Sequence, residues 1–164
     1  MTTRSELRFA PASEDDFEDL LLLRIEAMRD SLERIGRFDP VRARERFRTS
    51  FSAAHTRHIL INNEHAGFVA VKPIVRGLLL DHLYIRPAFQ NRGIGAWALE
   101  QVFGEADAAR QTLRVGALRE SDSNRFYLRH GFTKTDEDEW DIYYIRPADA
   151  DPKASSKGAL GNNT

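Results

Sequence analysis

The sequence predicts a mixed α/β fold, in which a central mixed β-sheet is flanked by helices. Three observations lead to this prediction. Apolar residues near the start of the chain recur at helical spacing, and two short segments rich in β-branched and aromatic residues then follow as a hairpin. Later, a strand, a helix and a second strand follow one another, and a crossover of this kind makes its two strands parallel.

The first expected elements are a short strand, Leu7 to Pro11, and a helix that starts at the capping-box-like run from Ser13 to Asp16. Gly36 interrupts the helical pattern, and Asp39 followed by Pro40 predicts the start of a second helix. The apolar residues of the first helix lie three and four positions apart, so they share the face that packs on the core: Phe17, Leu20, Leu21, Ile25, Met28 and Leu32.

The hairpin is expected to comprise strands His58 to Asn62 and Ala66 to Lys72, with Asn63 and Glu64 at the turn. Leu78 to Ile85 reads as a third strand of the same sheet. It is apolar on both faces, which is typical of a central strand.

The crossover helix is expected from Gly93 to about Ala109, followed by the strand Leu113 to Leu118. A short helix from Ser121 to His130 then ends at Gly131, a residue that tolerates the left-handed conformation common after helices. The last strands begin at Phe132.

Trp140 to Arg146 alternates well enough for a final strand. Residues 148–164 are rich in Ala, Ser, Gly, Lys and Asn without apolar periodicity, so we expect a disordered tail there. The 164 residues and their 41% hydrophobic content suit one domain, which we place at residues 1–147.

Composition argues against several classes of function. Lys and Arg total 24 against 25 Asp and Glu, so no net positive field favours nucleic acid. The absence of cysteine excludes disulfides and thiolate metal sites, and the five histidines lack the spacing of a metal site, so no metal is expected. No apolar run approaches the ~20 residues of a membrane helix, so we expect a cytoplasmic protein without membrane association.

The segment from Leu83 to Gly95 is a strand and a loop followed by two glycines that open a helix, a pattern typical of an anion site. A glycine-rich connecting turn is the alternative. A Walker loop is excluded because Ala96 and Trp97 stand where Lys and Ser or Thr are required. A dinucleotide fingerprint is partly matched, but it begins directly after its strand, whereas seven residues from Arg86 to Arg92 intervene here.

Two linked motifs resemble the GNAT superfamily of N-acetyltransferases. Gln90-x-x-Gly93-x-Gly95, after a strand that ends in Leu83-Tyr84-Ile85-x-Pro87, is similar to the superfamily's motif A. The run from Asn124 to Phe132, which ends in Gly-Phe, is similar to motif B. The motifs occur in the family's order and spacing, and the resemblance covers about residues 6–146.

The resemblance implies a GNAT-like acyl-CoA N-acyltransferase fold, whose sheet splays between two parallel strands and holds acetyl-coenzyme A (acetyl-CoA) there as co-substrate. The implied activity is acetyl transfer directly to a primary amine of a small molecule, peptide or protein, without a metal. A catalytically silent coenzyme A (CoA)-binding sensor or partner module is the alternative. Homodimers are common among such folds, and a homodimer therefore stays open.

The resemblance also assigns a cofactor site. The backbone of Leu83 and Ile85, with Tyr84 between them, would bind the thioester carbonyl and pantetheine as an added strand would. Asn124 would contact the pantetheine arm. Backbone N–H groups of the loop and first helical turn would bind the pyrophosphate, with Gln90 and Arg92 at its edge; these groups come from Asn91, Arg92, Gly93, Ile94, Gly95 and Ala96.

Tyr127 matches the family tyrosine that protonates the leaving thiolate, and a core-packing aromatic is the alternative. The base that deprotonates the amine is Asp81, His82, Glu26 or a water. Strand alternation predicts that Asp81 and His82 face opposite sides, so that only one of them meets the acceptor. We rank Asp81 first, although a structural salt bridge explains it equally well.

The acceptor side in this superfamily is commonly shaped by the first two helices, here about Arg24 to Arg48. This stretch is rich in arginine and also carries acidic residues. An acidic group on the acceptor is one interpretation, but solvated helices with alternating charge are favoured.

Overall fold

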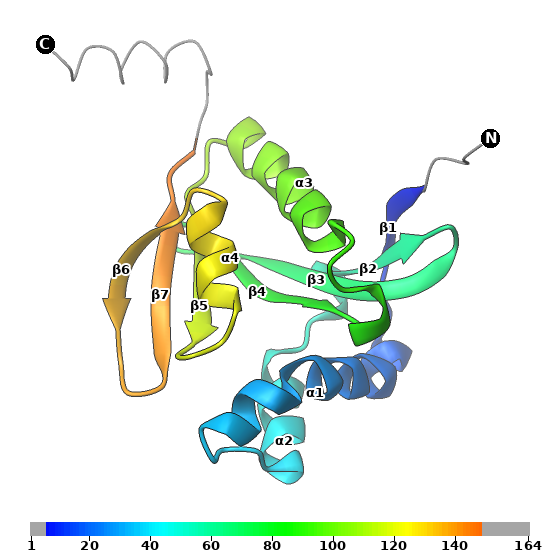
Figure 1. The fold of residues 1–164 in the computed structure, drawn as a ribbon. Coiled ribbons are helices and arrows are strands. Elements are labelled where there is room, and N and C mark those ends of the chain that lie inside the picture. Colours follow the sequence, from blue (N-terminus) through cyan, green and yellow to red (C-terminus); the bar gives the residue numbers. More distant parts are fainter. Residues whose placement is uncertain (1–5, 149–164) are drawn as a thin grey trace, which may run out of the picture.

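The computed structural model describes residues 6–148, which form a seven-stranded mixed sheet with helices on both faces (Figure 1). The sheet order is β1-β2-β3-β4-β5-β7-β6. The strands are β1 Leu7–Pro11, β2 Thr56–Ile61, β3 Glu64–Ile74, β4 Gly77–Ile85, β5 Leu113–Leu118, β6 Thr133–Glu137 and β7 Asp141–Arg146. The helices are α1 Phe17–Arg34, α2 Pro40–Ser50, α3 Ile94–Ala108 and α4 Ser123–Arg129, and short 3-10 turns occur at Glu14–Asp16, Ala53–His55 and Pro87–Phe89. The expected mixed fold and the parallel pairing of β4 with β5 are confirmed. The tail expected to be disordered lies outside the described residues, apart from Ala148.

The local start signals act as expected at both N-terminal helices. The backbone N–H of Ser13 donates to the Asp16 carboxylate at 2.8 Å, which orders the turn before α1. The Asp39 carboxylate accepts from the backbone N–H groups of Val41 and Arg42 at 3.1 and 3.3 Å, and so caps α2.

The hairpin turn lies one residue earlier than expected. Asn62 and Asn63 occupy it with φ of 50° and 68°, while Glu64 already pairs with Ile61. A two-residue hairpin turn requires positive φ at both positions, and Asn tolerates this better than Glu.

Two apolar clusters lie on opposite faces of the sheet. Helices α3 and α4 contribute residues such as Leu99 and Tyr127 to the larger cluster, together with Leu80 of β4. Helices α1 and α2 contribute Leu20 and Phe47 to the other. Figure 1 shows α1 and α2 on one side of β3 and β4 and α3 on the other. None of the helices within residues 6–148 has the length and apolar character needed to cross a membrane.

Candidate functional site

The centre of the sheet opens where β4 and β5 diverge. The two strands pair only from Leu78 opposite Leu113 to Leu80 opposite Val115. Beyond this point β4 continues to Ile85 and β5 to Leu118 with no pairing between them (Figure 1). Gly116 is exposed although it lies in the middle of a strand that pairs with β7 on its other side. A cleft therefore passes between the two strands.

The edge of β4 presents backbone groups to this cleft. The Arg86 N–H donates to Ala66 O at 2.8 Å, so the backbone groups of Arg86 point toward β3, and those of Tyr84 point the same way. Because backbone groups of successive strand residues point to opposite edges, those of Leu83 and Ile85 point toward the cleft. The Gln90 side chain donates to Ile85 O at 3.0 Å. Both positions expected to bind like an added strand thus have the required orientation.

The start of α3 lies at one end of the cleft. Gly93 caps the helix with φ of 77°, and the first helical bond runs from Trp97 N–H to Gly93 O at 3.0 Å. The N–H groups of Ile94, Gly95 and Ala96 therefore have no acceptor within the helix, and together with the helix dipole they make this end of α3 favourable for an anion. They line a groove of about 430 Å³ that also includes Gln90, Asn91, Gly93, Leu83, Tyr84 and Ile85.

Two of the expected cofactor residues do not line this groove. The Arg92 guanidinium lies over the ring of Phe89 at 5.4 Å from its centroid. The Asn124 amide donates to Leu118 O at 2.9 Å and to Ser121 O at 3.0 Å, and its oxygen accepts from the Tyr144 hydroxyl at 2.8 Å. In the structure Asn124 therefore holds the loop between β5 and α4.

Tyr127 is the expected proton donor that faces the cleft. Its ring packs against Phe132 and Phe126, its residue is only 6% exposed, and it lines both the groove and a smaller cavity of about 100 Å³ inside the cleft. Burial, with a smaller contribution from Tyr84, raises the pKa of Tyr127 above its ordinary value, so its hydroxyl stays protonated. The interpretations of Tyr127 as core aromatic and as donor both agree with this position.

The alternation argument for Asp81 and His82 is wrong, because β4 contains a bulge. Ala70 pairs with His82 and Val71 pairs with Leu80, which leaves Asp81 without a partner on β3. An extra residue shifts the alternation of the strand. Asp81 and His82 consequently line the same cavity, and the remaining candidate base, Glu26, is exposed and lines none of the cavities described here.

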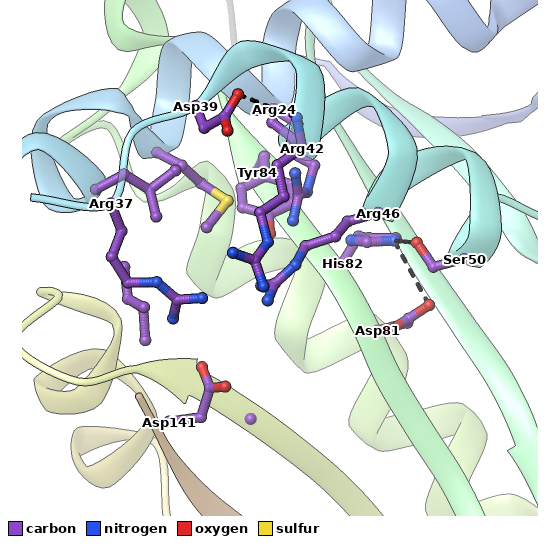
Figure 2. Close-up of a pocket in the computed structure, with 15 residues that line it drawn as sticks. Arg24, Arg37, Asp39, Arg42, Arg46, Ser50, Asp81, His82, Tyr84 and Asp141 are labelled. Carbon is purple, nitrogen blue, oxygen red and sulfur yellow. Dashed lines mark hydrogen bonds and ion pairs between the residues drawn. The ribbon is translucent and has the colours of Figure 1, made fainter. Parts of the chain in front are cut away.

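Asp81 and His82 belong to a closed ring of polar contacts with Lys72 and Ser50. Lys72 Nζ lies 2.8 Å from Asp81 Oδ2 and donates to Ser50 O. Ser50 Oγ lies 3.1 Å from His82 Nε2, which lies 3.5 Å from Asp81 Oδ2 (Figure 2). Burial lowers the pKa of His82 to about 4, against the opposing effect of the Asp81 charge, so the imidazole is neutral near pH 7. Sequence reasoning missed Lys72 and Ser50, because only the fold brings them to Asp81.

A third cavity, of about 310 Å³, lies between the α1–α2 pair and the open part of the sheet. Figure 2 shows arginine side chains from α1, α2 and their connection reaching into it, with Asp141 on the opposite wall. Burial raises the pKa of Asp141, and the charge of Asp138 adds to this effect. Its lining comprises Arg24, Met28, Leu32, Arg37, Asp39, Arg42, Ala43, Arg46, Ser50, Asp81, His82, Tyr84, Gly116, Leu118 and Asp141.

The three cavities share lining residues and adjoin one another at the opening in the sheet. Asp81 and Gly116 line both the arginine-lined cavity and the small central one. Leu83 and Tyr127 line both the central cavity and the groove at α3. Tyr84 lines all three. No cluster of three or more His, Cys, Asp or Glu side chains suited to a metal ion occurs in the described part of the chain.

A comparison with protein-family models identifies one family. The family model described as an acetyltransferase (GNAT) domain matches residues 53–134, half of the 164-residue chain. A comparison with curated protein sequences finds no significant match.

Solved structures with the same fold include several acetyltransferases. The PaiA N-acetyltransferase of Thermoplasma acidophilum, in complex with coenzyme A, superposes with a TM-score of 0.71 at 18% identity, over 87% of this chain and 99% of that one. An acetyltransferase of Thermus thermophilus gives 0.64 at 24% identity, over 86% and 96%. A GNAT-family acetyltransferase of Bacillus cereus gives 0.63 at 14% identity, over 87% and 98%.

Proposed function

The chain belongs to the GNAT acetyltransferase family, and from this membership we propose that it transfers an acetyl group from acetyl-CoA directly to a primary amine. The observation that carries the proposal is the row of three adjoining cavities at the opening between β4 and β5. It joins a groove with an anion site at α3 to a polar cavity beside α1 and α2, with Tyr127 and Asp81 at the two junctions. Two substrates that enter from opposite faces would meet there.

The groove suits coenzyme A by its chemistry. The unpaired N–H groups of Ile94, Gly95 and Ala96 offer donors to a pyrophosphate, and the cleft edge of Leu83 and Ile85 offers backbone partners to the pantetheine amides. Bound acetyl-CoA supplies an activated thioester, so no metal is needed to polarise the carbonyl.

Tyr127 is proposed as the group that meets the leaving sulfur. Within residues 6–148 its hydroxyl has no hydrogen-bond partner, and it lines the central cavity. A hydroxyl that stays protonated across the physiological range can donate to a thiolate as negative charge develops on it.

The amine enters from the side of Asp81. As an ammonium ion it would be attracted to the Asp81 carboxylate, and it must lose a proton before it attacks the thioester. Asp81 lies where the two cavities join, so we propose that it accepts this proton directly or through water, while Lys72 and His82 hold its position.

The proposal is tested first by calorimetry with acetyl-CoA, NAD and ADP on the full-length chain. We expect binding of acetyl-CoA that exceeds that of both nucleotides, followed by release of free thiol when a panel of primary amines is added. Absence of acetyl-CoA binding would overturn the proposal, and preference for NAD would favour a dinucleotide site. Tight binding with no transfer to any amine would favour the silent module.

A further inference from the structure

Four arginines from three different segments converge on the cavity beside α1 and α2. Arg24 comes from α1, Arg37 from the connection that follows it, and Arg42 and Arg46 from α2 (Figure 2). Arg42 and Arg46 are four residues apart, so they lie on one face of the helix. Arg24 and Arg37 are half-buried and Arg42 and Arg46 are exposed, and all four line the same cavity.

Three carboxylates, Asp39, Asp81 and Asp141, line the same cavity as the four arginines, which leaves a small excess of positive charge there. Within residues 6–148 none of the four guanidinium groups takes part in an ion pair, although arginines elsewhere do. Arg24 Nε is buried without a hydrogen-bond partner, an arrangement that costs free energy unless a ligand supplies an acceptor.

The neighbouring positive charges also disfavour the charged form of Arg46. Removal from water lowers the pKa of Arg46, and the positive charges of Arg37, Arg42 and Arg24 lower it further, against the opposing charge of Asp141. An anion placed among these groups would relieve this repulsion.

The size and surroundings of the cavity limit the size of the molecule that carries such an anionic group. Its volume of about 310 Å³ lies at the small end of ligand pockets. Beside it, Arg37 stacks on Trp140 at 3.9 Å, and the Arg34 side chain donates to Glu120 O at 3.2 Å. These contacts join the end of α1 and its following connection to the loops after β5 and before β7, which narrows the space to that of a small molecule.

Resting on the proposed acetyl transfer, we propose that the acceptor is a small primary amine that also carries a carboxylate or phosphate group. The arginine cluster, Arg24, Arg37, Arg42 and Arg46, binds the anionic group, and the Asp81 carboxylate receives the amine near the opening in the sheet. The two charged ends of the molecule thus fix its orientation.

The test compares amines that differ only in the anionic group. β-Alanine is paired with β-alaninamide, 4-aminobutyrate with 4-aminobutyramide, and phosphoethanolamine with ethanolamine, with rates expressed per concentration of neutral amine at saturating acetyl-CoA. We expect the anionic member of at least one pair to have the higher kcat/KM, by about tenfold or more (about 1.4 kcal/mol). The first two pairs report on carboxylate and the third on phosphate. Equal values within all three pairs would overturn the inference.

Arginine variants locate the effect. Arg42→Gln and Arg46→Gln should each reduce the preference for the anionic amine about tenfold while CoA affinity is unchanged. Arg48→Gln is the matched control, because Arg48 lies on the same helix but over the ring of Phe17, outside the cavity. A loss of preference of equal size in Arg48→Gln would contradict a specific site.

A binding measurement separates this inference from the proposed function. Calorimetry with β-alanine, 4-aminobutyrate, phosphoethanolamine and their neutral counterparts is performed on protein saturated with CoA, so that the anion site at α3 is occupied. Binding of an anionic member that is lost in Arg46→Gln would support the anion site even where no acetyl transfer occurs. Binding of none of them would overturn it, whatever the outcome of the transfer assay.

Discussion

Asp81 and His82 are consecutive residues of β4 and yet line one cavity, with Asp81 Oδ2 3.5 Å from His82 Nε2. The bulge at Asp81 makes this arrangement, because it interrupts the alternation that would otherwise separate the two side chains. Lys72 adds a positive charge 2.8 Å from the same carboxylate. The acceptor side of the cleft therefore places the Asp81 carboxylate beside the neutral imidazole of His82.

Asp81→Asn should lower kcat for amine acetylation by about 100-fold, because the amide can neither accept the amine proton nor attract the ammonium ion. Acetyl-CoA affinity should be unchanged, since Asp81 does not line the groove at α3. Steady-state kinetics and calorimetry on the same preparation check both statements. Glu26→Gln, at an exposed residue of α1, should retain full turnover. An equal loss of turnover in that variant would contradict a specific role of Asp81 as the base.

Tyr127→Phe should lower kcat by about 100-fold with little change in acetyl-CoA affinity, because only the hydroxyl that meets the leaving sulfur is lost. Tyr143→Phe is the control, since its hydroxyl bonds to Asp138 on the surface. Single-turnover release of CoA measures the step directly. Turnover equal to the unmodified enzyme would leave Tyr127 with a packing role alone.

Stability should fall as pH decreases from about 6.5 to about 4, because buried His82 resists protonation in the folded state while the unfolded chain takes up the proton. The free energy of unfolding has its full value above pH 6.5. Between pH 6.5 and pH 4 it decreases by on the order of 3 kcal/mol through His82. His65 acts in the same direction, because burial and the charges of His58 and Arg86 lower its pKa to about 4.

Urea unfolding at pH 7, 5.5 and 4.5 measures this dependence. His82→Gln should reduce this dependence and leave the contribution of His65, whereas His55→Gln should leave it unchanged, because His55 is exposed. An unchanged pH dependence in His82→Gln would show that the imidazole is not the responsible group.

Asn124→Ala should lower the free energy of unfolding by about 1–3 kcal/mol, because Leu118 O, Ser121 O and the Tyr144 hydroxyl all lose their partner. Tyr144→Phe removes only the last of these bonds and should cost less. Acetyl-CoA affinity measured beside urea unfolding distinguishes this role from the expected pantetheine contact. A tenfold loss of affinity with unchanged stability would favour the pantetheine contact.

Local signals in the sequence determine most of the fold and the groove at the start of α3 that is proposed to bind CoA. The strand and helix periods, the Asp39-Pro40 cap and the crossover from β4 through α3 to β5 depend on neighbouring residues. The expected elements all occur in the expected order, although several of their ends, including those at the hairpin turn, differ by one or more residues. The glycines before α3 likewise predict an anion site, because free N–H groups at a helix start follow from the backbone alone.

Only the tertiary structure decides the acceptor side. The bulge that directs Asp81 and His82 into one cavity arises from the pairing of β3 with β4. The residues of β4 alone do not predict this bulge. The convergence of four arginines, and the ring that joins Ser50 and Lys72 to Asp81, bring together side chains from separate elements. Such contacts depend on how helices pack across a sheet. The sequence pattern of alternating charges is identical whether the arginines face water or surround a substrate, so it cannot predict the cluster.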